Sequence, residues 1–172
     1  MSVVARALIV VAALALTAAG WYAVDAQRIT EHRVHALYEA QGAAWSRGDG
    51  KALCAQFASD YVGHEQQARP AGARLAQPDK TQACFAIDRL MKLRDSAHER
   101  GLPVKYTVTV GRILMARDGH SAEIELREHL DIGGEFLSDT VGADIVGVRD
   151  GELLLTGRRS MSHVSGPKAA EA

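Results

Sequence analysis

Hydrophobic positions change their spacing along the chain, from a helical period in the first half to strict alternation in the second. In the first half, apolar side chains recur every three or four residues, which is typical of helices that bury one face. This spacing predicts a helix over 26–47 and a short helix after it, whose apolar residues are Ala52, Leu53 and Phe57. A further helix is predicted from Asp79 onward, where Gln82 completes a capping box. Between them, residues 61–65 predict a short strand and residues 67–78 a loop.

The second half predicts strands joined by tight turns. The predicted strands are 104–116, 121–132, 135–148 and 152–164. Each joint carries Asp-Gly or Gly-Gly, which is typical of a two-residue hairpin. A meander of long strands has an apolar face that must be covered, and the helical half is the available cover. We therefore predict an α+β domain with N-terminal helices packed on the concave face of a bent antiparallel sheet.

The N-terminal segment has a different character from the rest. Residues 7–24 contain no charged side chain and follow Arg6, which is typical of an export signal cleaved after Ala26. An uncleaved transmembrane anchor is the alternative, because about eighteen apolar residues can span a bilayer. Both alternatives place the domain, expected over 27–164, on the periplasmic side, either soluble or tethered to the inner membrane. The small, polar residues 165–172 are expected to form a disordered tail.

Charge and cysteine content narrow the function further. Twenty basic and 21 acidic side chains give a net charge of −1, which argues against a nucleic-acid partner held through phosphates.

Cys54 and Cys84 lie in predicted helices, and in an oxidising compartment they would form one disulfide. Two buried free thiols are the alternative. A metal role is not expected, because neither cysteine has a partner at C-x-x-C spacing.

Three short motifs carry a resemblance to a known family. They are Trp45-Ser46-Arg47-Gly48-Asp49, the run from Phe57 to His64, and Val148-Arg149-Asp150-Gly151. With the order of predicted elements, they resemble the nuclear transport factor 2-like fold shared by SnoaL-like polyketide cyclases and ketosteroid isomerases. The resemblance covers residues 28–164. The tryptophan that the family usually has after the last glycine is replaced here by leucine. The resemblance implies a cone with a cavity between helices and sheet.

Alternation along the strands suggests which side chains face that cavity. On the last strand, Arg159 and His163 are expected to point toward the cavity or its mouth. On the second long strand, Glu128 interrupts an apolar row, and Arg159 is its expected cation. Tyr106 is expected to pack in the core or to line the cavity with its hydroxyl at a polar partner. The side on which Asp144 lies is ambiguous.

His64 is the remaining candidate, because the resemblance implies a cavity-facing histidine in this region. An imidazole there could shuttle protons, and Glu128 could act as a general acid or base. The alternatives are a hydrogen-bonded wall histidine and a structural ion pair between Glu128 and Arg159. A metal site made of His64, Glu128 and His163 is not expected, because the three lie on separate strands without diagnostic spacing. We expect no cofactor.

Three functions are compatible with these observations. The first is an exported module that binds a small apolar or amphipathic molecule or forms a homodimer through its sheet. The second is a SnoaL-like isomerase, cyclase or hydrolase that uses His64 or Glu128. The third is an assembly factor of an envelope complex, anchored through residues 7–24. The fold alone does not decide between them, and we expect the first.

Overall fold

The computed structural model describes residues 28–69 and 72–165, and the predicted export segment lies outside them. The helices within this part are α2 (Glu31–Arg47), α3 (Gly50–Ala55) and α4 (Lys80–Glu99). The strands are β1 (Phe57–Arg69), β2 (Gly72–Ala76), β3 (Val104–Met115), β4 (Ser121–Ile132), β5 (Phe136–Arg149) and β6 (Glu152–Ser165). Ser165, predicted as the start of the tail, therefore ends β6.

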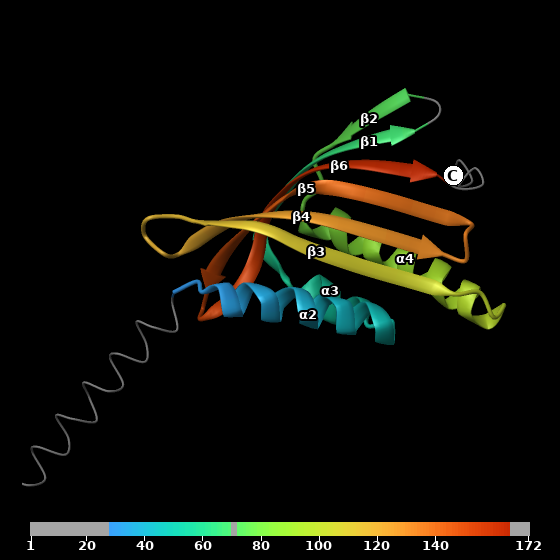
Figure 1. Cartoon of the computed structure of the whole chain (residues 1–172), viewed down its shortest axis with the longest axis horizontal. Helices are drawn as coiled ribbons and strands as arrows, with labels where there is room; N and C mark the ends of the chain where they lie inside the picture. The colour runs from blue at the N-terminus through green and yellow to red at the C-terminus, as the bar shows by residue number, and fades with distance from the viewer. Residues whose placement is uncertain (1–27, 70–71, 166–172) are drawn as a thin grey trace, which may run out of the picture.

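The strands form one curved sheet with the order β2-β1-β6-β5-β4-β3 (Figure 1). Strands β3 to β6 form the predicted antiparallel meander, while β1 joins β6 in parallel and β2 pairs antiparallel with β1. Helix α2 packs on β3 and β6, and α4 packs on β1, β3 and β4. The prediction of an α+β cone with helices on one face of a bent sheet is confirmed. We call the helix-covered face of the sheet the inner face and the opposite one the outer face.

The hairpin of β1 and β2 was missed in part by the sequence prediction. Strand β1 begins at Phe57, which we predicted in the short helix, and extends well past residue 65. Strand β2 lies within the predicted loop. It is an edge strand that stays mostly exposed, and Leu75 on it is 79% exposed. A strand without a buried face produces no apolar alternation, so the pattern could not predict it.

Capping residues fix where the helices begin and end. The Thr30 hydroxyl accepts a hydrogen bond from the Arg33 amide, so α2 begins after Thr30 rather than at residue 26. Asp79 and Gln82 form the predicted capping box of α4. Gly48 ends α2 with a φ of 73°, a left-handed conformation that favours glycine.

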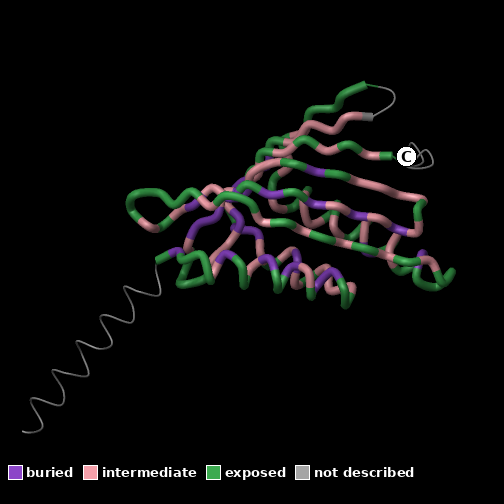
Figure 2. The backbone as a smooth tube through the Cα atoms, in the orientation of Figure 1, coloured by how far each residue is buried: buried purple, intermediate pink, exposed green. Residues whose placement is uncertain are grey.

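Two apolar clusters flank a polar centre in the core. The first consists of Ile29, Val34, Tyr38, Phe57, Tyr61, Ala122, Ile124, Leu126, Val146 and Leu155. The second consists of Ala44, Trp45, Leu53, Met91, Ala97, Leu130 and Ile132. Strand β4 contributes to both, with buried residues at every second position (Figure 2). Its predicted inner row is confirmed, and Glu128 lies between the two clusters.

A disulfide between Cys54 and Cys84 joins α3 to α4. The two Cα atoms lie 5.2 Å apart, within the usual range for such bonds. The disulfide prediction is confirmed, and the alternative of two free thiols is wrong.

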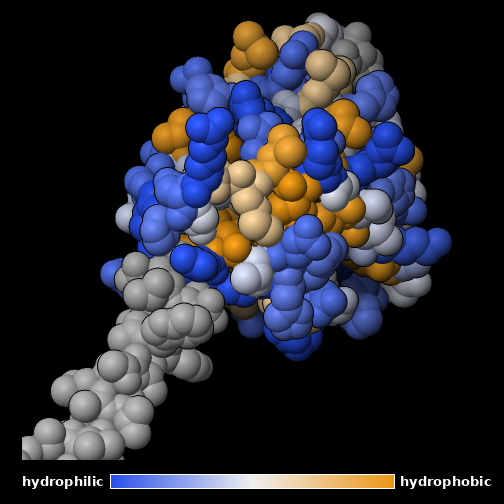
Figure 3. Space-filling model, turned by 60° about the vertical axis from the view of Figure 1, so that its left-hand side comes forward, coloured by the Kyte–Doolittle hydropathy of each residue, from blue (hydrophilic) through white to orange (hydrophobic). Residues whose placement is uncertain are grey.

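Hydrophobic side chains also remain on the surface. In Figure 3, a central group of hydrophobic side chains is surrounded by hydrophilic ones. The exposed large hydrophobic residues include Val62, Leu75, Val141 and Met161, which belong to four different strands. No helix in the described ranges is both long enough and apolar enough to cross a membrane.

Candidate functional site

Arg158 is the centre of a charged cluster on the inner face of the sheet. Its Nε donates to Oδ1 of Asp144 over 2.6 Å, and its Nη2 donates to Oδ2 over 3.0 Å. The same guanidinium donates to both carboxylate oxygens of Glu128, over 3.0 and 3.1 Å. One arginine on β6 therefore bridges a carboxylate of β5 and a carboxylate of β4, with paired hydrogen bonds to each.

Two tyrosines complete the hydrogen bonding of the carboxylates. The Tyr38 hydroxyl, from α2, donates to Oδ2 of Asp144 over 2.8 Å. The Tyr106 hydroxyl, from β3, donates to Oε1 of Glu128 over 3.1 Å. We call these five residues the Arg158 cluster. It connects the long N-terminal helix to four strands of the sheet.

The cluster is buried, and its charges depend on one another. Asp144 is fully buried, and the side chains of Glu128 and Arg158 are 12% and 16% exposed. Burial alone would lower the pKa of Arg158, but Asp144 and Glu128 outweigh it and raise that pKa. Burial, reinforced by the neighbouring carboxylates, raises the pKa of Tyr38 and Tyr106. Both hydroxyls therefore remain protonated donors at neutral pH.

A β-bulge explains why Arg158, rather than Arg159, occupies this position. Leu155 and Gly157 pair with consecutive residues of β5, so Thr156 is an extra residue on β6. One extra residue exchanges the faces of every side chain beyond it. The prediction that Arg159 and His163 point inward is therefore wrong. Arg159 lies on the outer face, where its Nη2 is 2.7 Å from a carboxylate oxygen of Glu123, and His163 is exposed.

Glu128, Tyr106 and Asp144 are the other residues considered for the inner face, and all three lie on it. Glu128 is buried as predicted, but its cation is Arg158. Tyr106 faces the interior with its hydroxyl on a polar partner, one of the two predicted arrangements. Asp144, whose side was ambiguous, is on the inner face.

His64 does not face the interior. It is exposed on β1, in register with Arg159 of β6, and so belongs to the outer face. The prediction of a cavity-facing His64 is wrong, because the inward row of β1 is the one that contains buried Tyr61. His64 and His163 therefore cannot converge with Glu128 on a substrate or a metal. Among residues 28–69 and 72–165, no group of three or more His, Cys, Asp or Glu could hold a metal ion.

Glu65 was missed by the sequence prediction, although alternation from Tyr61 would have found it. It is half-buried on β1. Burial raises its pKa, Arg158 lowers it, and Glu128 and Asp144 raise it further. Glu65 is thus a third carboxylate within the electrostatic field of the Arg158 cluster.

Gln41 was also missed, and among the described residues it is the one buried side chain with a polar atom that lacks a hydrogen-bond partner. It is 7% exposed, and its Oε1 has no hydrogen-bond partner. Gln41 lies on the buried stripe of α2, one turn from Tyr38 and one turn from Trp45. Trp45 stacks on Tyr106 with ring centroids 4.9 Å apart. Gln41 therefore lies between Tyr38, which belongs to the Arg158 cluster, and Trp45, which contacts another member, Tyr106.

The raised pKa of Glu65 leads to a prediction for stability. The folded state holds the Glu65 proton more tightly than the unfolded state, so ionisation of Glu65 costs stability at neutral pH. That cost disappears as the pH falls below the unfolded pKa of about 4.3. Glu65→Gln is expected to stabilise the chain at pH 7 by up to about 1 kcal/mol, a small effect because Glu65 keeps contact with solvent. The gain should vanish near pH 3.5.

Urea denaturation at the two pH values measures this difference. Glu125→Gln is the control, because it removes an exposed carboxylate that accepts from Arg112 on the outer face. It should give no stabilisation at pH 7. A Glu65→Gln variant that is no more stable than the parent at pH 7 would contradict the prediction.

A cleft of about 330 Å³ lies beside the cluster. Its lining residues are Trp45, Ser46, Arg94, His98, Leu102, Pro103, Val104 and Tyr106. Tyr106 therefore has its ring at the cleft and its hydroxyl on Glu128. The cleft therefore borders the Arg158 cluster at Tyr106.

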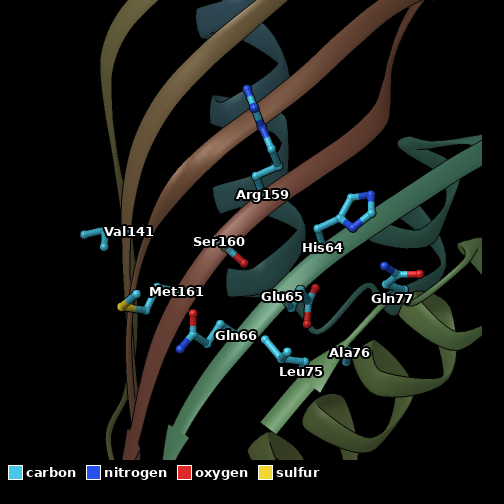
Figure 4. Close-up of a pocket in the computed structure, with 10 residues that line it drawn as sticks. All are labelled: His64, Glu65, Gln66, Leu75, Ala76, Gln77, Val141, Arg159, Ser160 and Met161. Atoms are coloured by element: carbon cyan, nitrogen blue, oxygen red, sulfur yellow. The ribbon is translucent and has the colours of Figure 1, made fainter. Parts of the chain in front are cut away.

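A second hollow, of about 440 Å³, lies on the outer face (Figure 4). Exposed His64, Leu75, Val141, Arg159 and Met161 are among its lining residues. The hollow is lined by residues of β1, β2, β5 and β6 and by Gln77, which follows β2. The exposed lining residues lie on the face opposite the Arg158 cluster, and Glu65 and Ser160 also border the hollow.

Comparisons with known proteins identify the fold. No protein-family model and no curated protein matches the sequence. Among solved structures, an NTF2-like protein of unknown function from Shewanella baltica has a TM-score of 0.52 at 12% identity, covering 78% of this chain and 94% of its own. An NTF2-like protein of unknown function from Silicibacter pomeroyi has a TM-score of 0.52 at 15% identity, covering 76% and 93%. A domain of unknown function with a cystatin-like fold from Nostoc punctiforme has a TM-score of 0.54 at 13% identity, covering 76% and 75%. The chain therefore has the nuclear transport factor 2-like fold.

Proposed function

We propose that the domain over residues 27–164 binds a small amphipathic molecule between its helices and the inner face of its sheet. The observation that carries this proposal is the buried Gln41 Oε1 without a partner. Buried polar groups in folded proteins almost always have a hydrogen-bond partner, and leaving one unpaired costs about 1–3 kcal/mol. A bound molecule that donates to Gln41 removes this cost. The cleft beside Trp45 and Tyr106 gives it a way in, and its volume is within the usual range for small-molecule sites.

Native mass spectrometry of the protein purified from its own host tests the proposal. We expect a retained small molecule on the parent chain and its loss from Gln41→Leu. Without ligand, Gln41→Leu should be more stable than the parent by about 1 kcal/mol, because the unpaired buried amide is gone. Glu39→Gln is a control on the exposed side of the same helix, away from the cleft, and should retain the molecule. A parent chain without any bound molecule, together with a Gln41→Leu variant that is less stable, would overturn the proposal.

We also propose that two copies pair through the outer face. Val62, Leu75, Val141 and Met161 expose apolar surface there, around the hollow of about 440 Å³. Exposed apolar groups gathered on one face favour association. The same native spectrum reports the mass of the assembly, and Met161→Lys should shift it toward the monomer.

We further propose that residues 1–26 direct the domain to the periplasmic side. The disulfide between Cys54 and Cys84 supports this placement, because such bonds persist in oxidising compartments. The mass of the mature chain distinguishes the two forms of export. A chain that begins at Gln27 indicates cleavage, and the full-length mass indicates a membrane tether through residues 7–24.

A further inference from the structure

The charges around the Arg158 cluster do not balance. Three carboxylates share this region. Arg158 contacts those of Glu128 and Asp144, and half-buried Glu65 pairs across β1 and β6 with Ser160, the next inward residue after Arg158. Three charged groups of the described residues act on Glu65, and Arg158 is the positively charged one. The formal excess is therefore two negative charges in a partly buried space, where opposite charges attract more strongly than in water.

The hydrogen bonds show which acceptor atoms in this region lack a donor. The Arg158 guanidinium already donates four hydrogen bonds to Asp144 and Glu128. Nothing in the described part of the chain donates a hydrogen bond to the Glu65 carboxylate. Gln41 Oε1 is unpartnered as well, and Gln41 lies on the stripe of α2 that contacts the cluster through Tyr38. Both unmatched groups are acceptors, so a bound molecule must supply donors.

The surroundings favour an organic cation over a metal ion. No arrangement of carboxylates, histidines and cysteines in residues 28–69 and 72–165 could hold a metal. Aromatic rings, by contrast, belong to the cluster or lie beside it, and organic ammonium groups are attracted to the faces of such rings. These rings belong to Tyr38, Trp45, Tyr61 and Tyr106.

We propose that the molecule bound in this domain is an organic amine, whose protonated nitrogen lies against Glu65 while a further donor on it reaches Gln41 Oε1. This inference rests on the proposed small-molecule function and specifies its ligand class. The ammonium group offsets part of the excess negative charge. Its apolar part lies among the aromatic rings between the helices and the sheet.

Three molecules with one ring and different polar groups test the ligand class. They are cyclohexylmethylamine, cyclohexylmethanol and cyclohexanecarboxylate, titrated into the purified full-length chain by calorimetry at pH 7. We expect the amine to bind at least about tenfold more tightly than the alcohol, because hydrogen bonds between ionised groups are stronger than neutral ones. In Glu65→Gln this preference should fall below about threefold. Glu125→Gln, which neutralises an outer-face carboxylate, should keep it.

Each other outcome overturns the inference in a recognisable way. If the alcohol or the carboxylate binds as tightly as the amine, the ligand class is wrong, while the small-molecule function stands. If Glu65→Gln keeps the full preference, the assignment of Glu65 is wrong. If none of the three binds the parent chain, the amine inference fails, and native mass spectrometry decides the small-molecule function separately.

Discussion

Replacing Arg158 with methionine is expected to lower the free energy of unfolding by about 3–5 kcal/mol. The substitution removes four hydrogen bonds and leaves Asp144 and Glu128 buried without a counter-charge. Removing one partner of a buried ion pair costs far more than the pair contributes, because the remaining charges stay desolvated. A domain of this size has a total stability of about 5–15 kcal/mol, so the loss would be a large part of it.

Arg159→Met is the matched control, because it changes the neighbouring residue in the same way. Arg159 is 58% exposed and pairs with Glu123 on the outer face, so its loss should cost less than about 1 kcal/mol. Chemical denaturation compares the two variants. Adding Glu128→Gln and Asp144→Asn to Arg158→Met should recover part of the loss, since it removes the unpaired charges. Equal effects of Arg158→Met and Arg159→Met would show that the cluster does not hold the fold together.

Removing the disulfide is expected to lower the free energy of unfolding by about 3–4 kcal/mol in the chain-entropy model. The bond closes a loop with a sequence separation of 30 and constrains the unfolded chain accordingly. In the folded state it holds α3 against α4, beside the start of β1. Its loss should therefore leave the folded structure in place and act mainly on the unfolded state.

The double variant Cys54→Ala, Cys84→Ala and the reduced parent chain measure this contribution independently. Both should unfold at a lower denaturant concentration than the oxidised parent, by the same amount. Dithiothreitol should have no effect on the double variant. A parent chain whose unfolding midpoint does not move on reduction would rule out a stabilising role for the bond.

The sequence predicted those elements that have one clearly buried face. The α2 stripe and the inner row of β4 each repeat with a single period over many residues, and both were confirmed. The edge strand β2 buries neither face, so no periodicity marks it. Helix ends depended on single caps, and Thr30 limits α2 more sharply than the apolar stripe does.

The site was predicted less well than the fold, for two physical reasons. Alternation placed Glu128 correctly because β4 runs without interruption past it. On β6, the bulge at Thr156 lies between the apolar residues that set the phase and the arginines that carry charge. Gln41 was missed for another reason. A polar residue on a buried stripe can have a purely structural role or a binding role, and the sequence does not separate the two. The missing hydrogen-bond partner of Gln41 Oε1, which only the structure shows, separates them.

The single extra residue at Thr156 decides which side chains of β6 face the interior. The segment after it carries two different sets of side chains on its two faces. With the extra residue, Arg158, Ser160 and Ser162 are turned toward the helices, while Arg159, Met161 and His163 are turned toward solvent. A one-residue deletion in this stretch during evolution would exchange the two sets without altering any other amino acid. Relatives of this fold can therefore present a different interior through strand length alone, and an alignment that ignores this would compare the wrong arginine.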